Sequence, residues 1–234
     1  LGEEAEQLDG RVSDDLRVSR PVKQGRVDDL DACRILLKQT LENSKHRVVL
    51  GPRVVMGTAS GLSKLEKRTL KEVVKAAGAR KVDLIECVIL SVLGAGRDPS
   101  KPEGHLVLDL GAGSGEIALV ASGKVQVSRS VPEIGRRLDQ AIVESLREEL
   151  HILVSLEEAE KLKKELGAAH CPVETDTRTT YGCDTETGLP CQREVRAELV
   201  CKALEPILEE VAEETRQVLK SLPSGFVHDL AQSG

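Results

Sequence analysis

A short segment in the middle of the chain, His105 to Val120, reads HLVLDLGAGSGEIALV and combines an apolar run, an acid and a glycine-rich turn. Two chemistries use this combination. In a methyltransferase the turn opens a helix, whose N-terminus and glycines let the backbone approach S-adenosylmethionine. In a phosphate-binding hairpin the turn joins two strands, and its backbone N–H groups approach the phosphate oxygens of ATP. The residues around the turn must decide between the two.

The sequence after the turn favours the hairpin. The segment that leads to the next turn, Ser122 to Lys124, is too short for the helix of about three turns that a methyltransferase needs. Beyond it, Val125 and Val127 alternate with polar residues, as is typical of a strand. The acid that would bind the ribose hydroxyls is missing, because this strand runs into Ser128. We therefore predict a β-meander, and an S-adenosylmethionine-dependent methyltransferase remains an alternative.

Each residue type in such a hairpin has a chemical use. Asp109, at the end of the first strand, could hold waters of a Mg²⁺ ion. Gly111 and Gly113 leave backbone N–H groups open to phosphate oxygens, and Ser114 could add a hydroxyl to the γ-phosphate or to the attacking water. A tight glycine turn without a ligand is the simpler alternative, so the turn alone does not establish a nucleotide site.

The segments that must position this turn alternate between helical and strand-like patterns, which is typical of an α/β domain. Ser63 and Glu66 form a capping box, and the apolar spacing after it predicts a helix over 64–77. Ser155 with Glu158 predicts a second capped helix that ends at Gly167. The other expectations are strands over 54–56 and 81–86, helices over 87–96, 138–150 and 196–220 with a kink at Pro206, and a polar, turn-rich segment over 168–193.

Composition limits the classes of function. No apolar run reaches the roughly 20 residues of a membrane span, and no secretory leader opens the chain, so a cytoplasmic protein is expected. The net charge of -6 argues against nucleic acid as a partner, because nucleic-acid binding depends on clustered Lys and Arg. Tyr181 and Phe226 are too few aromatics to make a stacking platform for bases.

Six cysteines are widely spaced and contain no CxxC pair, so reduced thiols are expected. A group of four residues around one loop could bind zinc: His170, Cys171, Cys183 and Cys191. Structural zinc sites, however, usually draw their ligands from close pairs. Thiols near a solvent-exposed loop are the simpler interpretation.

Segments that match one known family occur in the same order along nearly the whole chain. They are LGEEA, RPVKQGRVDDLDA, VVMGTASGLSKLEKR, KVDLIE, LGAGRDPSKPEGHLVLDLGAGSGEIALVASGKVQVSRSV, LDQAI, EEAEKLKKELGAA, TGLP and a helix containing Glu205 and Pro206. In this series the chain resembles the MreB family of bacterial actins, within the actin and heat-shock chaperone ATPase superfamily. No single segment is decisive, but their colinear order is specific.

The resemblance implies an α/β, actin-like (ribonuclease H-like) fold of two domains around an ATP cleft. Residues 1–108 would be the remainder of the first domain with the connecting helix, and residues 109–234 the second domain with the phosphate hairpin and the adenosine-side helix. The family's first phosphate hairpin would precede Leu1 and its last nucleotide loop would follow Gly234, so the fold is expected to be incomplete at both termini.

The resemblance also implies a function. It predicts ATP and Mg²⁺ as ligands, homopolymer filaments at the inner face of the cytoplasmic membrane, membrane-bound cell-wall synthesis proteins as partners, and a role in cell shape. Any enzyme activity would be at most a slow ATPase coupled to polymerisation. The residues that it assigns to nucleotide binding are Asp109, Gly111, Ala112, Gly113, Ser114, Gly135, Glu160 and Lys163, with Asp109 holding Mg²⁺ through water. Glu160 and Lys163 would contact the adenosine, and their spacing also suits a surface ion pair.

The departures from the family pattern concern catalysis. The family's hydrolytic glutamate falls on Cys87, one residue after Glu86, and a thiol cannot replace a carboxylate as the acceptor for the attacking water. After Gly135 the family's acids are replaced by Arg136 and Arg137. A degenerate or truncated, non-hydrolysing scaffold is therefore one alternative function, and a chaperone-like ATPase is another.

A membrane contact is expected where the family often has a small apolar loop. Val48, Val49 and Leu50 follow basic residues there, a pairing that suits insertion into anionic lipid. The alternative is that these three residues begin the strand that runs through Val55.

Overall fold

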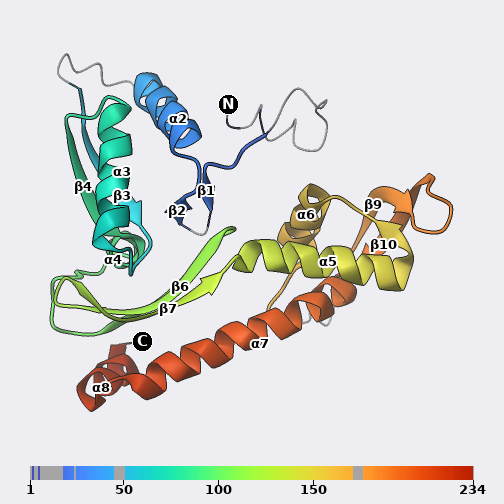
Figure 1. Ribbon diagram of the computed structural model, residues 1–234. Helices are drawn as coiled ribbons and strands as arrows, with labels where there is room; N and C mark the ends of the chain where they lie inside the picture. Colours follow the sequence, from blue (N-terminus) through green and yellow to red (C-terminus); the bar gives the residue numbers. More distant parts are fainter. Residues whose placement is uncertain are drawn as a thin grey trace. The chain divides into compact units, whose positions relative to one another are not determined.

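The computed structural model describes residues 2, 5, 18–23, 25–44, 51–170 and 176–233 (Figure 1). The chain forms two compact units. Unit 1 comprises Leu1–Asp109, Ala118–Ser128 and His228–Gly234, and unit 2 comprises Leu110–Ile117 and Arg129–Val227. The units therefore interleave along the sequence, and the expected domain boundary between residues 108 and 109 stays a prediction.

Unit 1 contains a parallel β–α–β arrangement. Its elements before the glycine turn are β1 (Val22–Lys23), β2 (Arg26–Val27), α2 (Leu30–Asn43), β3 (Arg53–Thr58), α3 (Lys64–Ala76), β4 (Lys81–Glu86) and α4 (Cys87–Gly94). Strands β3 and β4 pair in parallel, with Val54 opposite Val82, and α3 makes the crossover between them. Val74, Ala79 and Val82 form the buried core beneath this crossover.

Helix α3 confirms the helix expected from the capping box. Ser63 Oγ accepts from the Glu66 N–H at 3.2 Å, and the Glu66 carboxylate accepts from the Ser63 N–H at 2.8 Å. The Ser63 and Glu66 N–H groups, which have no partner within the helix, are thereby satisfied. Strand β4 likewise coincides with the strand expected over 81–86.

The glycine-rich segment forms the expected meander. Strands β5 (His105–Leu110), β6 (Ser114–Ala121) and β7 (Lys124–Pro132) lie in this order in one sheet. Ser122 and Gly123 connect β6 to β7, and both have positive φ angles, 52° and 72°, as a type I′ hairpin turn requires. A strand rather than a helix follows the glycine turn, so the chain lacks the helix that the methyltransferase alternative requires at this place.

Unit 2 is built from helices around an antiparallel sheet. Its elements are α5 (Ile134–Leu150), β8 (Ile152–Leu153), α6 (Leu156–Leu166), β9 (Thr177–Asp184), β10 (Pro190–Arg196) and α7 (Ala197–Ser221), which the last helix, α8 (Ser224–Ser233), follows. The sheet order is β10-β9-β8. Helices α5 and α7 lie side by side (Figure 1) and bury Ile142, Leu146 and Leu204 in a shared core. Helix α7 continues through Pro206.

The expectation of a turn-rich segment over 168–193 is wrong for residues 177–184 and 190–193. Strands β9 and β10 form a hairpin there, with Tyr181 opposite Gln192. One face of this hairpin is exposed, and only Thr180 and Val195 are fully buried, so the apolar alternation that marks a strand is weak. The Asp184 carboxylate accepts from the Glu186 and Thr187 N–H groups and closes the turn.

The second capping box is present only in half. Ser155 Oγ accepts from the Glu158 N–H, as expected for the start of α6. The Glu158 carboxylate instead accepts from Thr180 Oγ1 at 2.9 Å and lies 3.6 Å from Arg178. Because its carboxylate contacts Thr180 and Arg178 of β9, Glu158 connects α6 to β9 and does not complete the capping box.

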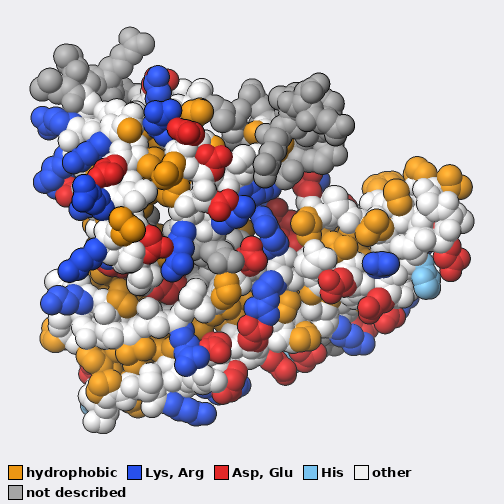
Figure 2. Space-filling view, viewed as in Figure 1, with side chains coloured by type: hydrophobic (Ala, Val, Ile, Leu, Met, Phe, Trp, Pro, Cys, Tyr) orange, Lys and Arg blue, Asp and Glu red, His pale blue; other side chains and the backbone are white. Residues whose placement is uncertain are grey.

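Three expectations concern the surface or masked segments. None of the described helices is both long and apolar enough to cross a membrane. The membrane segment Val48, Val49 and Leu50 lies outside the described residues, and so does Cys171 of the candidate zinc group. The described residues contain no group of three or more His, Cys, Asp or Glu side chains that could hold a metal ion. On the face shown in Figure 2, acidic and basic side chains are interspersed rather than gathered by sign.

Candidate functional site

The glycine turn between β5 and β6 is tightly closed by its backbone. The Gly111 N–H donates to the Ser114 carbonyl oxygen at 2.8 Å. A Cβ atom at position 111 would lie only 2.8 Å from that same oxygen, so a side chain there would force the turn open. Glycine at this position is therefore a requirement of the turn geometry.

Helix α5 begins directly against this turn. The Gly135 N–H donates to the Gly111 carbonyl oxygen and the Arg136 N–H to the Ala112 carbonyl oxygen, both at 3.1 Å. A Cβ atom at position 135 would lie 2.7 Å from Ala112 Cα. The absence of a side chain at Gly135 is what lets the helix approach, and the structure thus brings Gly135 to the turn; its role in nucleotide binding stays a prediction.

Lys163 connects α6 to the same place. Its Nζ atom lies 2.6 Å from Asp139 Oδ1 and 3.3 Å from the Gly135 carbonyl oxygen. The Lys163 and Asp139 side chains are only 21% and 13% exposed. Because this pair is shielded from water, its Coulomb attraction is stronger than that of a surface pair, and it joins α6 to the first two turns of α5.

Asp139 is a site residue that the sequence reasoning missed. It lies within the segment LDQAI, one helical turn after Gly135, so an acid at that spacing from the glycine was the available signal. Its carboxylate makes no capping contact and instead holds Lys163 in place.

Glu160, the other residue of the expected adenosine pair, has a different partner. Its Oε1 atom lies 2.9 Å from Lys164 Nζ, and this hydrogen bond lowers the pKa of the Glu160 carboxyl. Glu160 and Lys163 thus pair with different residues, and Glu160 has no contact with the glycine turn among the described interactions.

In unit 1, Asp109 lies beside Ser91 of α4. Ser91 Oγ donates to the Cys87 carbonyl oxygen at 3.0 Å and is 3.5 Å from Asp109 Oδ2. Cys87 packs against β3, since a Cβ atom at Gly57 would lie 2.8 Å from the thiol sulfur. The structure therefore places Asp109 and Cys87 around one serine.

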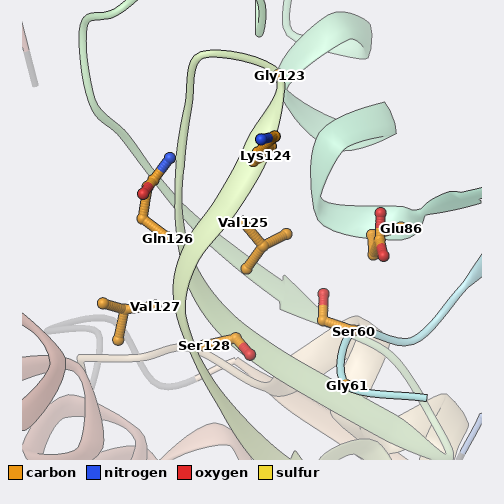
Figure 3. A pocket seen from close by; sticks show the side chains of 9 residues that line it. All are labelled: Ser60, Gly61, Glu86, Gly123, Lys124, Val125, Gln126, Val127 and Ser128. Atoms are coloured by element: carbon orange, nitrogen blue, oxygen red, sulfur yellow. The ribbon is translucent and has the colours of Figure 1, made fainter. Parts of the chain in front are cut away.

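Glu86 points into a different environment from its neighbour Cys87. Its Oε1 atom accepts from Lys67 Nζ of α3 at 2.9 Å, and this hydrogen bond lowers the pKa of the Glu86 carboxyl. The carboxylate also borders a cavity of about 400 Å³ in unit 1 (Figure 3). The residues that line this cavity are Ser60, Gly61, Glu86, Gly123, Lys124, Val125, Gln126, Val127 and Ser128.

Comparison with known proteins gives one consistent result. The model of the MreB/Mbl protein family matches residues 1–234. The cell shape-determining protein MreB of Escherichia coli (strain K12) is 29% identical over 238 residues, which span the whole chain and 68% of that protein. The cell shape-determining protein Mbl of Bacillus subtilis (strain 168) is 25% identical over 235 residues and is covered to 71%.

Solved structures agree with the sequence comparison. The crystal structure of MreB 5 of Spiroplasma citri bound to AMPPNP has a TM-score of 0.92 and 29% identity, covering 100% of this chain and 71% of that one. The ADP-bound crystal structure of the same protein has the same TM-score and 28% identity. A MamK double helical filament shares the fold, with a TM-score of 0.78, 17% identity and coverage of 97% and 68%. The actin-like α/β fold expected from the sequence is thereby confirmed.

Proposed function

The chain belongs to the MreB/Mbl protein family, and from this premise we propose that it is an actin-like cytoskeletal protein that binds ATP with Mg²⁺ and forms filaments that govern cell shape. Two relatives are named cell shape-determining proteins. A third, whose fold matches this chain over its whole length, has been crystallised with AMPPNP and with ADP.

The observation that carries the proposal is the junction of the glycine turn, α5 and α6 in unit 2. Two backbone hydrogen bonds, from the Gly135 and Arg136 N–H groups, join the start of α5 to the turn, and Lys163 donates to the Gly135 carbonyl oxygen. We assign the phosphate chain to the backbone N–H groups of Ala112, Gly113 and Ser114, because the Gly111 N–H already donates to the Ser114 carbonyl oxygen. We assign the adenosine to the side of Lys163 and Glu160. Glycines let the backbone approach phosphate oxygens, and Lys163 already has its orientation fixed by Asp139.

Asp109 has the chemistry to hold Mg²⁺ through water. Its carboxylate is partly exposed, and among the described residues Asp109 Oδ2 has one long contact, 3.5 Å from Ser91 Oγ. Carboxylate oxygens suit Mg²⁺, which keeps several of its own waters when it binds beside phosphates. When bound, the ion would neutralise negative charge on the phosphates.

Slow or absent hydrolysis is the second part of the proposal. Hydrolysis needs a carboxylate that orients the attacking water, and the family position for it carries Cys87. Glu86 does not substitute for it here, because its carboxylate is engaged by Lys67 at 2.9 Å. A non-hydrolysing, actin-like scaffold is therefore the second candidate function.

Filament assembly and location at the inner face of the cytoplasmic membrane are proposed from family membership. A relative with the same fold forms a double helical filament. Membrane-bound cell-wall synthesis proteins are the partners proposed on the same basis. Under this proposal the protein acts as a peripheral, polymerising support and not as a metabolic enzyme.

Titration calorimetry tests the nucleotide proposal. The protein is titrated with Mg-ATP and, separately, with S-adenosylmethionine, and sedimentation with and without nucleotide then tests assembly. We expect Mg-ATP binding that Asp109→Ala weakens at least tenfold and that Asp31→Ala, an exposed acid at the start of α2, leaves unchanged. Binding of S-adenosylmethionine, or no binding of Mg-ATP by the unmodified protein, would contradict the proposal.

A further inference from the structure

Two adjacent arginines begin α5 beside the glycine turn, and they differ in their ionic partners. Arg137 makes two hydrogen bonds to the Glu210 carboxylate of α7, one of them 2.8 Å from Nη1 to Oε1, and these bonds raise the pKa of the Arg137 guanidinium. Arg136 has Glu133 as its ion-pair partner among the described residues, at 3.7 Å, which is too long for a hydrogen bond. Its side chain is 50% exposed.

The position of Arg136 is unfavourable for a cation unless an anion offsets it. Positive charge in the first turn of a helix is disfavoured by the helix dipole. The Glu133 side chain makes no capping hydrogen bond there. The other charged groups nearby have closer partners, since Lys163 holds Asp139 at 2.6 Å and Arg137 holds Glu210. Among the described residues, Arg136 is therefore the cation at this junction whose carboxylate partner lies farthest away.

The backbone places the Cα atom of Arg136 at the turn. The hydrogen bond from the Arg136 N–H to the Ala112 carbonyl oxygen sets its Cα atom beside the residues to which the proposed phosphate chain is assigned. A guanidinium group presents planar N–H donors that match phosphate oxygens, and such charge-assisted bonds are stronger than neutral ones. The distance of its counter-ion, 3.7 Å, and the adjacent turn thus point to the same ligand chemistry.

We propose that Arg136 binds the phosphate chain of the nucleotide and makes the affinity of this protein depend on the number of phosphates. This inference rests on the proposed nucleotide site. It adds Arg136 to that site, at a position where the family pattern has an acid. An arginine in that place favours ligands of higher negative charge. The preference should therefore follow the order ATP, ADP, adenosine.

Calorimetric titrations of three proteins test this inference: the unmodified chain, Arg136→Gln, and Arg147→Gln as the matched control. Arg147 is an exposed arginine in the last turn of the same helix. Each protein is titrated with Mg-ATP, Mg-ADP and adenosine at one ionic strength. Arg136→Gln should weaken Mg-ATP binding about tenfold and Mg-ADP binding about threefold, and leave adenosine binding unchanged. Arg136→Lys, which keeps the charge but not the planar donors, should lose less than Arg136→Gln.

The outcomes separate the inference from the function on which it rests. If the unmodified chain binds none of the three ligands, the proposed nucleotide function fails. If it binds them and Arg136→Gln binds Mg-ATP equally well, the inference about Arg136 is overturned while the nucleotide function stands. An equal loss in Arg147→Gln, or an equal loss of adenosine binding in Arg136→Gln, also overturns it. Thermal unfolding of each unliganded variant verifies folding, and Arg136→Lys decides the question if Arg136→Gln fails to fold.

Discussion

Two lysine–carboxylate pairs with the same chemistry have opposite consequences in the two units. In unit 2, Lys163 and Asp139 are shielded from solvent, and Lys163 also donates to the Gly135 backbone beside the glycine turn. In unit 1, Lys67 and Glu86 are more exposed, 37% and 28%, and the pair engages the carboxylate next to the family's catalytic position. The first pair lies at the proposed nucleotide site and would organise it, whereas the second would keep the Glu86 carboxylate from the proposed role in hydrolysis. The effect of an ion pair near a candidate site therefore depends on which charged groups it leaves available to a ligand.

The largest expected effect comes from disrupting the contact between Gly135 of α5 and the glycine turn, next to which Lys163 donates to the Gly135 carbonyl oxygen. Gly135→Ala introduces a Cβ atom 2.7 Å from Ala112 Cα, so either the helix or the turn must move. We expect a loss of roughly 2–3 kcal/mol of stability and at least a hundredfold loss of Mg-ATP affinity. Denaturant unfolding and calorimetry measure the two effects. Gly94→Ala, in α4, is the control, because a Cβ atom there meets nothing within 4 Å. Equal behaviour of the two variants would refute the close approach of α5.

The second expected effect concerns the missing carboxylate in unit 1. Cys87→Glu restores an acceptor for the attacking water at the family position and should raise ATP turnover about tenfold or more, because one positioned carboxylate typically contributes ~10²-fold or more to such a step. Phosphate release over time measures it. Cys183→Glu, at an exposed thiol of β9, adds the same charge elsewhere and should not raise turnover. If the unmodified chain hydrolyses ATP as fast as Cys87→Glu does, Cys87 does not limit hydrolysis and the prediction is wrong.

The two ion pairs should differ in their contributions to stability. Lys163→Met leaves the shielded Asp139 carboxylate without its partner and should cost about 2 kcal/mol, whereas Lys67→Met should cost only about 0.5 kcal/mol because water solvates Glu86. Urea unfolding at neutral pH compares the two variants. Asp139→Leu combined with Lys163→Met should recover part of the loss, since no buried charge then remains. Equal costs for the two single variants would remove the distinction between the pairs.

The smallest expected effect is the pH dependence of the pair in unit 1. Lys67 lowers the pKa of Glu86 from its ordinary value of 4.5, so the pair stabilises the folded state above pH 4.5. This stability is lost as the pH falls through the lowered pKa, where Glu86 becomes protonated in the folded state too. Urea unfolding of the unmodified chain and of Lys67→Met between pH 7 and pH 3 should give curves that converge at the acid end. A difference that is constant over this range would contradict the role of Glu86.

Local sequence signals predicted the elements whose patterns are strong. The capping box of α3, the apolar run of β4 and the alternation after the glycine turn each correspond to an observed element. The hairpin of β9 and β10 was missed because its sequence shows little alternation of apolar and polar residues. One face is exposed, and the buried Thr180 is a polar residue that donates to Glu158 of α6. Asp139 was missed for a related reason, since an acid within a helix looks like a solvated residue until Lys163 is placed beside it.

The sequence by itself determined the family, the α/β alternation and the glycines of the turn, because these follow from residue order, periodicity and the absence of side chains. Only the tertiary structure decided which charges meet. It paired Glu160 with Lys164 and Lys163 with Asp139, and it paired Glu86 with Lys67. It left Arg136 with an acid, Glu133, at 3.7 Å, too far for a hydrogen bond. The physical reason is that a charge takes its role from the partners within a few ångströms, and those partners come from helices and strands that are distant in the sequence.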